Sequence, residues 1–275
     1  MLDVEHSQRW CARTMRAHAT SFYFSTRLLP ALKREAIEAL YGLFRFIDDA
    51  ADEPGPTLSE RRAGFVRIRA DIDGLPMSSH RTDAPWFMAV RRAFERFPID
   101  IQDVRRLASG CESDLEPQPI RTMRDLEAYS ASVAGTVGRC TLPVLGLRDD
   151  DSLRRAERLG IAMQYTNILR DIQKDREMGR HYLPTDAFPE VALSELMAIV
   201  AQSARTYYRE SEVLAARLPN DGSRAALLIT SSVYEGILDR LRRRKYDPSG
   251  ERVYVPLESK MLLAVRSLCR SYVGF

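Results

Sequence analysis

The chain has 275 residues, which is enough for one large domain or two ordinary ones with a sizeable core. Apolar residues make up 45% of the chain and charged residues 29%, as in ordinary folded proteins. The net charge of +3 is too small for the clustered basic face of a nucleic-acid-binding protein, so we expect no nucleic-acid partner.

The first strong helical pattern covers residues 31–52, where apolar side chains recur at steps of three and four. The end of this pattern carries an acidic cluster, Asp48-Asp49-Ala50-Ala51-Asp52. Tyr41 and Arg45 precede Asp48 at helical steps, so these polar groups form one stripe beside the apolar face. A Pro-Gly-Pro run at 54–56 then ends the helix.

Glycines interrupt the next helical pattern, in the segment VAGTVG (133–138) that follows Tyr129. A glycine destabilises a helix interior, so it usually has a packing or functional reason there. These glycines would admit either a ligand or a second helix to the backbone, and the spacing alone does not choose between the two.

A second acidic cluster, Asp171-Ile172-Gln173-Lys174-Asp175, follows a long helical pattern over 153–172. Gln164 and Asn167 precede Asp171 at helical steps, with Arg170 adjacent. This arrangement repeats the polar stripe of the first helix.

Each cluster places two aspartates at i and i+4, on one face of its helix. Either cluster alone is more simply explained as a solvated acidic surface. Two stripes of Tyr, Gln, Asn and Asp within apolar helices instead predict an interior wall of hard oxygen ligands. Such a wall suits Mg²⁺, and the neighbouring arginines suit phosphate.

The helical patterns continue over 191–217 and 224–241, which are separated by an Asn-Asp-Gly turn at 220–222. Alternation of apolar and polar residues is scarce, and the residues around Val253 and Val255 form at most a short extended piece. No linker is long enough to separate domains. We therefore expect an all-α fold with a single domain over residues 1–275.

The basic run RLRRRK (240–245) has two interpretations, a solvated helix end or a site of attraction to anionic lipid headgroups. The N-terminus has no apolar signal-peptide core, and no run approaches 18 apolar residues. We expect a cytoplasmic protein, with peripheral contact at the inner face of the membrane as a further expectation.

The cysteines and histidines show no metal-ligand spacing such as CxxC or HExxH, which argues against a zinc site or a redox motif. We interpret the four cysteines as reduced thiols. Any bound metal should then be a hard cation held by carboxylates.

Six segments together resemble the squalene/phytoene synthase family, in order and over nearly the whole chain. They are HATSFYFSTRLLP (18–30), ALYGLFRFIDDAADE (39–53), VAGTVG (133–138), GIAMQYTNILRDIQKD (160–175), GRHYLP (179–184) and ILDRLRRRKYD (237–247). The resemblance implies an isoprenoid-synthase helical bundle around a central cavity, with the two aspartate-rich helices facing each other across its mouth.

The same resemblance assigns roles to individual residues. It implies that Mg²⁺ is bound by Asp48, Asp49, Asp52, Asp171 and Asp175. It implies that the prenyl diphosphate substrates contact Ser21, Phe22, Tyr41, Arg45, Gln164, Asn167, Arg170, Tyr182, Tyr246 and Arg252. Among these, Arg45 and Arg170 would stabilise the departing diphosphate, and Tyr129 would lie near the reacting carbons.

The implied reaction is the head-to-head condensation of two prenyl diphosphates through a cyclopropylcarbinyl diphosphate, by an enzyme of the prenyltransferase class. We expect two geranylgeranyl diphosphates to give phytoene. The alternatives are condensation of farnesyl diphosphate to squalene, dehydrosqualene or presqualene diphosphate, and a non-catalytic relative that acts as an assembly factor. Both acidic clusters are intact, which argues against the last.

Two further expectations separate these products. Thr26 is small where C15-selective relatives carry a bulky aromatic residue, which predicts a preference for C20 substrates. No GxGxxG motif lies between a strand and a helix, and the VAGTVG and SFYFST segments resemble carotenoid-type rather than reductive members. We therefore expect that no nicotinamide cofactor is needed.

Overall fold

A computed structural model describes residues 3–249 and 252–273 and confirms the all-α prediction, since no strand occurs among these residues. The α-helices are α1 (Val4–His18), α2 (Thr20–Thr26), α3 (Ala31–Asp52), α4 (Leu58–Gly74), α5 (Phe87–Arg96), α6 (Ile101–Ser113), α7 (Met123–Ser130), α8 (Thr136–Leu145), α9 (Asp150–Glu177), α10 (Leu193–Arg217), α11 (Ser223–Arg243) and α12 (Leu257–Val273). A π-helical turn, Ala131–Gly135, joins α7 to α8, and a short 3₁₀ helix, Thr185–Ala187, follows α9.

The four helices predicted from periodicity all exist. The bounds of α3 agree with the prediction, whereas α9 is longer at both ends. Its earlier start is explained by Asp149, which caps the helix and accepts a hydrogen bond from the Ser152 amide. The residues around Val253 and Val255 form no regular element, so the suggested extended piece is not a strand.

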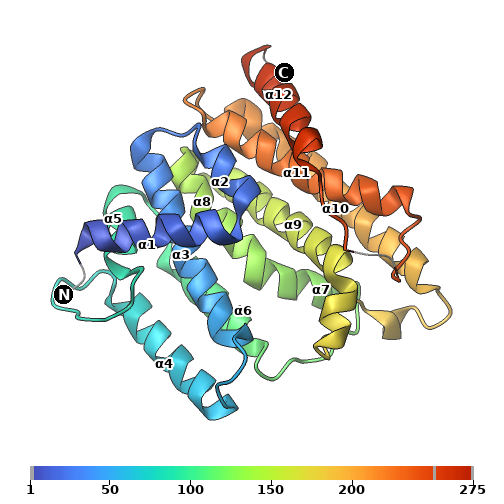
Figure 1. Cartoon of the computed structure of the whole chain (residues 1–275), viewed down its shortest axis with the longest axis horizontal. Helices are drawn as coiled ribbons and strands as arrows, with labels where there is room; N and C mark the ends of the chain where they lie inside the picture. Colours follow the sequence, from blue (N-terminus) through green and yellow to red (C-terminus); the bar gives the residue numbers. More distant parts are fainter. Residues whose placement is uncertain (1–2, 250–251, 274–275) are drawn as a thin grey trace.

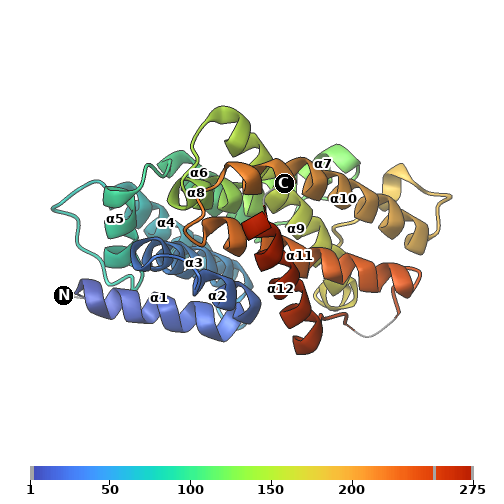
Figure 2. The ribbon, with the colours of Figure 1, turned by 90° about the horizontal axis from the view of Figure 1, so that it is seen from above.

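Helix α9 crosses the middle of the molecule, with α3 on one side and α10 and α11 on the other (Figures 1 and 2). Helices α1, α2 and α12 lie in front of this layer in Figure 1 and along the lower edge of the molecule in Figure 2. The two helices that carry the acidic clusters, α3 and α9, are therefore central elements whose positions depend on packing from several sides.

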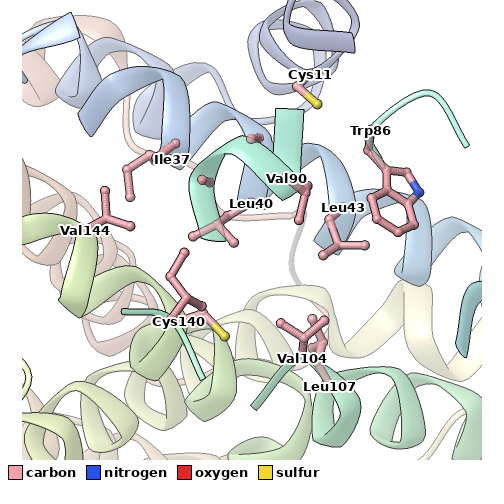
Figure 3. Packing of buried hydrophobic residues seen from close by; sticks show 14 of the residues in the cluster. Cys11, Ile37, Leu40, Leu43, Trp86, Val90, Val104, Leu107, Cys140 and Val144 are labelled. Atoms are coloured by element: carbon pink, nitrogen blue, oxygen red, sulfur yellow. The ribbon is translucent and has the colours of Figure 1, made fainter. Parts of the chain in front are cut away.

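One hydrophobic core surrounds α3. Figure 3 shows Ile37, Leu40 and Leu43 of this helix packed against apolar side chains of α5, α6 and α8. Leu40 and Leu43 are at most 1% exposed, and each such side chain contributes about 1.5–3 kcal/mol when it leaves water. This core holds α3 in place along its apolar face, so its polar stripe points elsewhere.

A second core lies between α9, α10 and the C-terminal half of α11. It includes Tyr165 of α9 and Tyr208 of α10, both almost fully buried. The hydroxyl groups of Tyr208 and Thr166 are hydrogen bonded at 3.0 Å, so the buried phenol does not lack a partner. This core fixes α9 along the side that faces away from α3.

The glycines of the VAGTVG segment serve helix packing. A Cβ atom on Gly138 would lie 2.1 Å from the backbone oxygen of Ala156 in α9, and one on Gly160 would lie 2.2 Å from that of Ala134. Both contacts are with backbone, which has little room to move. Gly138 therefore has one of the two roles considered, the close approach of a second helix, and it also lines a cavity between the helices.

Within the part of the chain that the structure describes, no helix combines the length and apolar character needed to cross a bilayer.

We predict that Gly160→Ala lowers the free energy of unfolding by about 1–3 kcal/mol, because its methyl group would overlap the Ala134 carbonyl. The matched control is Gly64→Ala in α4, where the nearest atom to the new Cβ is 4.0 Å away. This control should be more stable than wild type by about 0.5–1 kcal/mol. Urea denaturation of both variants measures the difference, and equal effects would contradict the packing role.

Candidate active site

A cavity of about 670 Å³ lies between the helices, and residues of α1, α2, α3, α6, α8, α9, α11 and the 252–260 segment line it. One part of its wall is apolar, with side chains such as Leu142, Val137 and Ile37. Another part carries both polar stripes, including Asp48 and Asn167. The cavity thus combines a hydrocarbon-like interior with a strongly charged mouth.

The first acidic cluster is neutralised by an arginine of its own helix. Arg45 lies 3.3 Å from Asp48 and 2.5 Å from Asp49, one turn earlier on α3. Burial and the neighbouring charge of Asp52 together raise the pKa of Asp48 to about 6, against the opposing effect of Arg45. A cation at this position would relieve the unfavourable charge.

The second cluster is neutralised from two separate parts of the chain. Asp171 accepts hydrogen bonds from Arg170 at 3.0 Å and from Arg252 at 2.6 Å. Burial tends to raise the pKa of Asp171, but these two arginines outweigh it and hold the pKa below its ordinary value. Burial and the charge of Asp171 raise the pKa of Asp175 to about 6.

Arg180 connects the two clusters. Gly179 has a φ of +73°, and here the chain turns back so that the Arg180 amide donates to the Asp175 carbonyl at 2.7 Å. The Arg180 guanidinium then forms an ion pair with Asp52 on α3. The charge of Asp52 also acts on Asp175, so the carboxylates of the two helices face each other across the mouth.

Among the described residues, no three carboxylate, imidazole or thiol groups stand close enough together to hold a metal as they lie, because arginines separate the aspartates. Two polar atoms at the cavity nevertheless point to a polar ligand. Asn167 Oδ1 and Arg45 Nε are buried without a hydrogen-bond partner within the described structure. Carboxylate and amide oxygens suit Mg²⁺, and a free guanidinium nitrogen suits a phosphate oxygen, so the residues fit both groups.

Tyr129 and its neighbours form a second polar group beside the mouth. The Tyr129 hydroxyl donates to Asp114 at 3.0 Å, and its ring stacks on Tyr182 with centroids 5.0 Å apart. Burial raises the pKa of Asp114 to about 6, although the Tyr129 hydrogen bond and the charge of Arg180 oppose the rise. Asp114 and Tyr129 both line the cavity.

The structure brings most of the predicted site residues to the cavity wall: Phe22, Tyr41, Arg45, Asp48, Tyr129, Gln164, Asn167, Arg170 and Arg252. Asp49, Asp52, Asp171, Asp175 and Tyr182 do not line the cavity themselves, but they contact or interact electrostatically with residues that do.

One predicted residue lies away from the cavity, and one cannot be compared with it. Tyr246 is half-buried beyond the end of α11, against the core between α9, α10 and α11, and does not line the cavity. The side chain of Ser21 lies outside the described part of the structure.

Comparison with known proteins agrees with this geometry. Residues 15–259 match the family model described as squalene/phytoene synthase. The chain belongs to the squalene/phytoene synthase family. Members of this family are prenyltransferases, and the chain is an enzyme of this class.

Two curated relatives in this family are named phytoene synthase. The protein from Thermus thermophilus is 33% identical, with the alignment covering 95% of this chain and 92% of the relative. The protein from Arthrospira platensis is 32% identical, with coverage of 93% and 90%. A solved structure of a dehydrosqualene synthase in complex with ligand superposes with a TM-score of 0.88 at 28% identity, covering 98% of both chains.

Two residues at this candidate site were not among the predicted site residues. Arg180 is part of the GRHYLP segment and could have been identified there as a cation beside the second cluster. Asp114 belongs to none of the matching segments, and its place in the cavity wall and the hydrogen bond from Tyr129 identify it.

We predict that Asp114→Asn makes the metal-free enzyme more stable at neutral pH. A folded-state pKa of about 6, above the unfolded value, means that wild-type stability is full below about pH 4 and falls as the pH rises through 6. The neutral amide avoids this loss and still accepts from Tyr129. Urea denaturation should show little difference at pH 4.5 and an advantage of at most about 3 kcal/mol at pH 7.5. A difference independent of pH would contradict this account.

Proposed function

We propose that the chain joins two molecules of geranylgeranyl diphosphate head to head and forms phytoene. One observation supports this most directly: the facing aspartate clusters and their arginines lie at the mouth of a cavity whose deeper wall is apolar. An amphiphile with a diphosphate head and a hydrocarbon tail matches this division. The relatives that are named phytoene synthase support the choice of the C20 substrate in this proposal.

The proposed metal ligands are Asp48, Asp49 and Asp52 of α3 with Asp171 and Asp175 of α9. When bound, Mg²⁺ would neutralise the diphosphate charge and so favour its departure. Arg45, Arg170 and Arg252 hold guanidinium groups beside the same carboxylates, where they can also bind diphosphate oxygens. The arginines thus offset part of the negative charge of the mouth without substrate and would help to hold the diphosphate when it is bound.

The apolar walls would keep water from the allylic cation that diphosphate departure leaves behind. Attack by the second prenyl chain, with loss of one proton, would give a cyclopropylcarbinyl diphosphate. A second ionisation with ring opening, followed by loss of a second proton, would give the linear hydrocarbon. The Tyr129 ring lies at the cavity wall, stacked on Tyr182, and its π-face would stabilise these cations. We propose that the diphosphate released in the first step accepts the protons that are lost.

The wall beside α2 would set the length of the prenyl chain. Thr26 is 2% exposed, lines the cavity and donates its hydroxyl to the Tyr23 carbonyl at 2.8 Å. A small side chain here leaves room for the tail of a C20 substrate. The similarity to a dehydrosqualene synthase structure supports condensation of farnesyl diphosphate as the second candidate, which the same position would distinguish.

We predict that Asp48→Asn and Asp171→Asn each lower turnover of prenyl diphosphate by at least about 100-fold, because each removes an anionic ligand from the metal site. Circular dichroism should show an unchanged helical fold. The control is Asp150→Asn, an exposed residue at the opposite end of α9, which should remain active. Chelation with EDTA should abolish turnover and added Mg²⁺ restore it. Activity that survives both the substitutions and chelation would refute the metal site. A wild type without activity would instead support the non-catalytic alternative.

We predict that Thr26→Phe shifts substrate preference from geranylgeranyl to farnesyl diphosphate by about tenfold or more, because the added ring fills the end of the tail site. Thr26→Val, which changes the hydroxyl but hardly the volume, serves as the control and should keep the wild-type preference. Competition assays with both radiolabelled substrates give the ratio. A wild-type enzyme that accepts only the C15 substrate would overturn the proposed product.

We predict that the product forms with Mg²⁺ and substrate alone and carries a central double bond, because the last step is proton loss rather than hydride delivery. Mass spectrometry of the hydrocarbon made with and without NADPH checks this. A product two hydrogens heavier that appears only with NADPH would identify a squalene-type reaction instead.

A further inference from the structure

The outer face of α12 is apolar although it is exposed. Met261, Leu262 and Val265 are 62%, 55% and 56% exposed, and they lie within about one helical turn of each other. The opposite side of α12 packs on α11, where Leu263 lies against Gly236 and the Ser267 and Ser232 hydroxyls are hydrogen bonded. A helix at a protein surface normally turns polar residues outward, so this outer face lacks the covering that its composition requires.

The apolar surface continues beyond α12. Tyr254, in the segment that leads into α12, is 73% exposed, and Phe24 of α2 is 61% exposed. Helices α2 and α12 lie on the same face of the molecule in both overall views (Figures 1 and 2). We call Phe24, Tyr254, Met261, Leu262 and Val265 the α2–α12 face.

This face adjoins the cavity directly. Tyr254 both lines the cavity and is exposed, so the cavity reaches the surface here. Phe22 and Thr26 line the cavity from α2, whose Phe24 faces outward, and Lys260 lines it from α12. The same two elements therefore form the cavity wall on one side and the exposed apolar surface on the other.

Exposed arginines lie on the elements of the α2–α12 face and on α1, which packs against α2. Arg13 and Arg16 of α1 and Arg27 after α2 are exposed, as are Arg252 and Arg266 on the C-terminal side. Helix α1 buries Cys11 and Met15 against α3, which leaves Arg13 on its outer side. Exposed apolar side chains with neighbouring arginines are the composition of surfaces that bind anionic lipid interfaces.

We propose that the α2–α12 face docks on an anionic lipid bilayer, so that prenyl tails enter the cavity from the bilayer and the hydrocarbon product returns to it. The proposal rests on the proposed function, because only substrates and products with long hydrocarbon chains need such a route. A product without polar atoms has no favourable path through water, and a bilayer offers an apolar phase at the cavity opening. The expected membrane contact thus lies at α12 and α2 rather than at the basic run 240–245.

Vesicle co-sedimentation with the full chain tests this docking surface. Wild type should bind vesicles of phosphatidylglycerol and phosphatidylcholine more strongly than vesicles of phosphatidylcholine alone. The triple variant Met261→Ser, Leu262→Ser, Val265→Ser should bind the anionic vesicles at least about tenfold more weakly. The matched control replaces three equally exposed apolar residues near α4, Leu58→Ser, Val66→Ser and Met77→Ser, and should bind as wild type does.

Turnover in detergent micelles separates this proposal from the proposed function. The triple variant should keep wild-type turnover of micellar geranylgeranyl diphosphate while it loses activity on vesicle-borne substrate. Equal vesicle binding by wild type and the triple variant would overturn the docking surface. A different result would also overturn it: wild type binds no vesicles but forms a dimer in analytical ultracentrifugation, and the triple variant is a monomer. A second copy of the chain would then cover the face. Vesicle binding by a wild type that turns over no prenyl diphosphate would support the docking surface and overturn the proposed function.

Discussion

Repulsion between aspartates is the interaction on which the arrangement of this site depends. Two helices bring carboxylates to a shared mouth, and burial together with neighbouring negative charge raises the pKa of Asp48 and Asp175 to about 6. Such a concentration of charge would drive α3 and α9 apart without compensation. Arginines from four places supply it: Arg45 from the first helix, Arg170 from the second, Arg180 from the turn after the second, and Arg252 from the segment before α12.

The helix packing makes this concentration of charge possible. Separate hydrophobic cores hold α3 and α9 by their apolar faces, which leaves both polar stripes directed to the space between them. The backbone contacts at Gly138 and Gly160 bring α8 and the π-helical turn against α9 more closely than any side chain would allow. The position of the stripes is therefore a consequence of packing on the far sides of the helices, and the charged groups themselves oppose it.

The cavity joins two environments that usually exclude each other. Its mouth is charged and partly exposed, with the Arg252 side chain 63% accessible, whereas Thr26 and Leu142 in its wall are each 2% exposed. A substrate with an anionic head and an apolar tail suits this division, because each part meets groups of its own kind. The exposed apolar side of α2 and α12 extends the same division to the outer surface of the molecule.

The sequence by itself determined the all-α fold, the bounds of α3 and the two stripes on α3 and α9, because helical periodicity and i, i+4 spacing are local properties. It also identified the family through segments that retain their order along the chain. The role of the VAGTVG glycines remained open until the structure showed Gly138 against the backbone of Ala156. Only the tertiary structure decided that Arg252 pairs with Asp171, 81 residues away, that Asp114 accepts from Tyr129, and that Tyr246 lies off the cavity. These placements depend on how helices cross and where loops return, and no local pattern encodes the angle at which two distant segments meet.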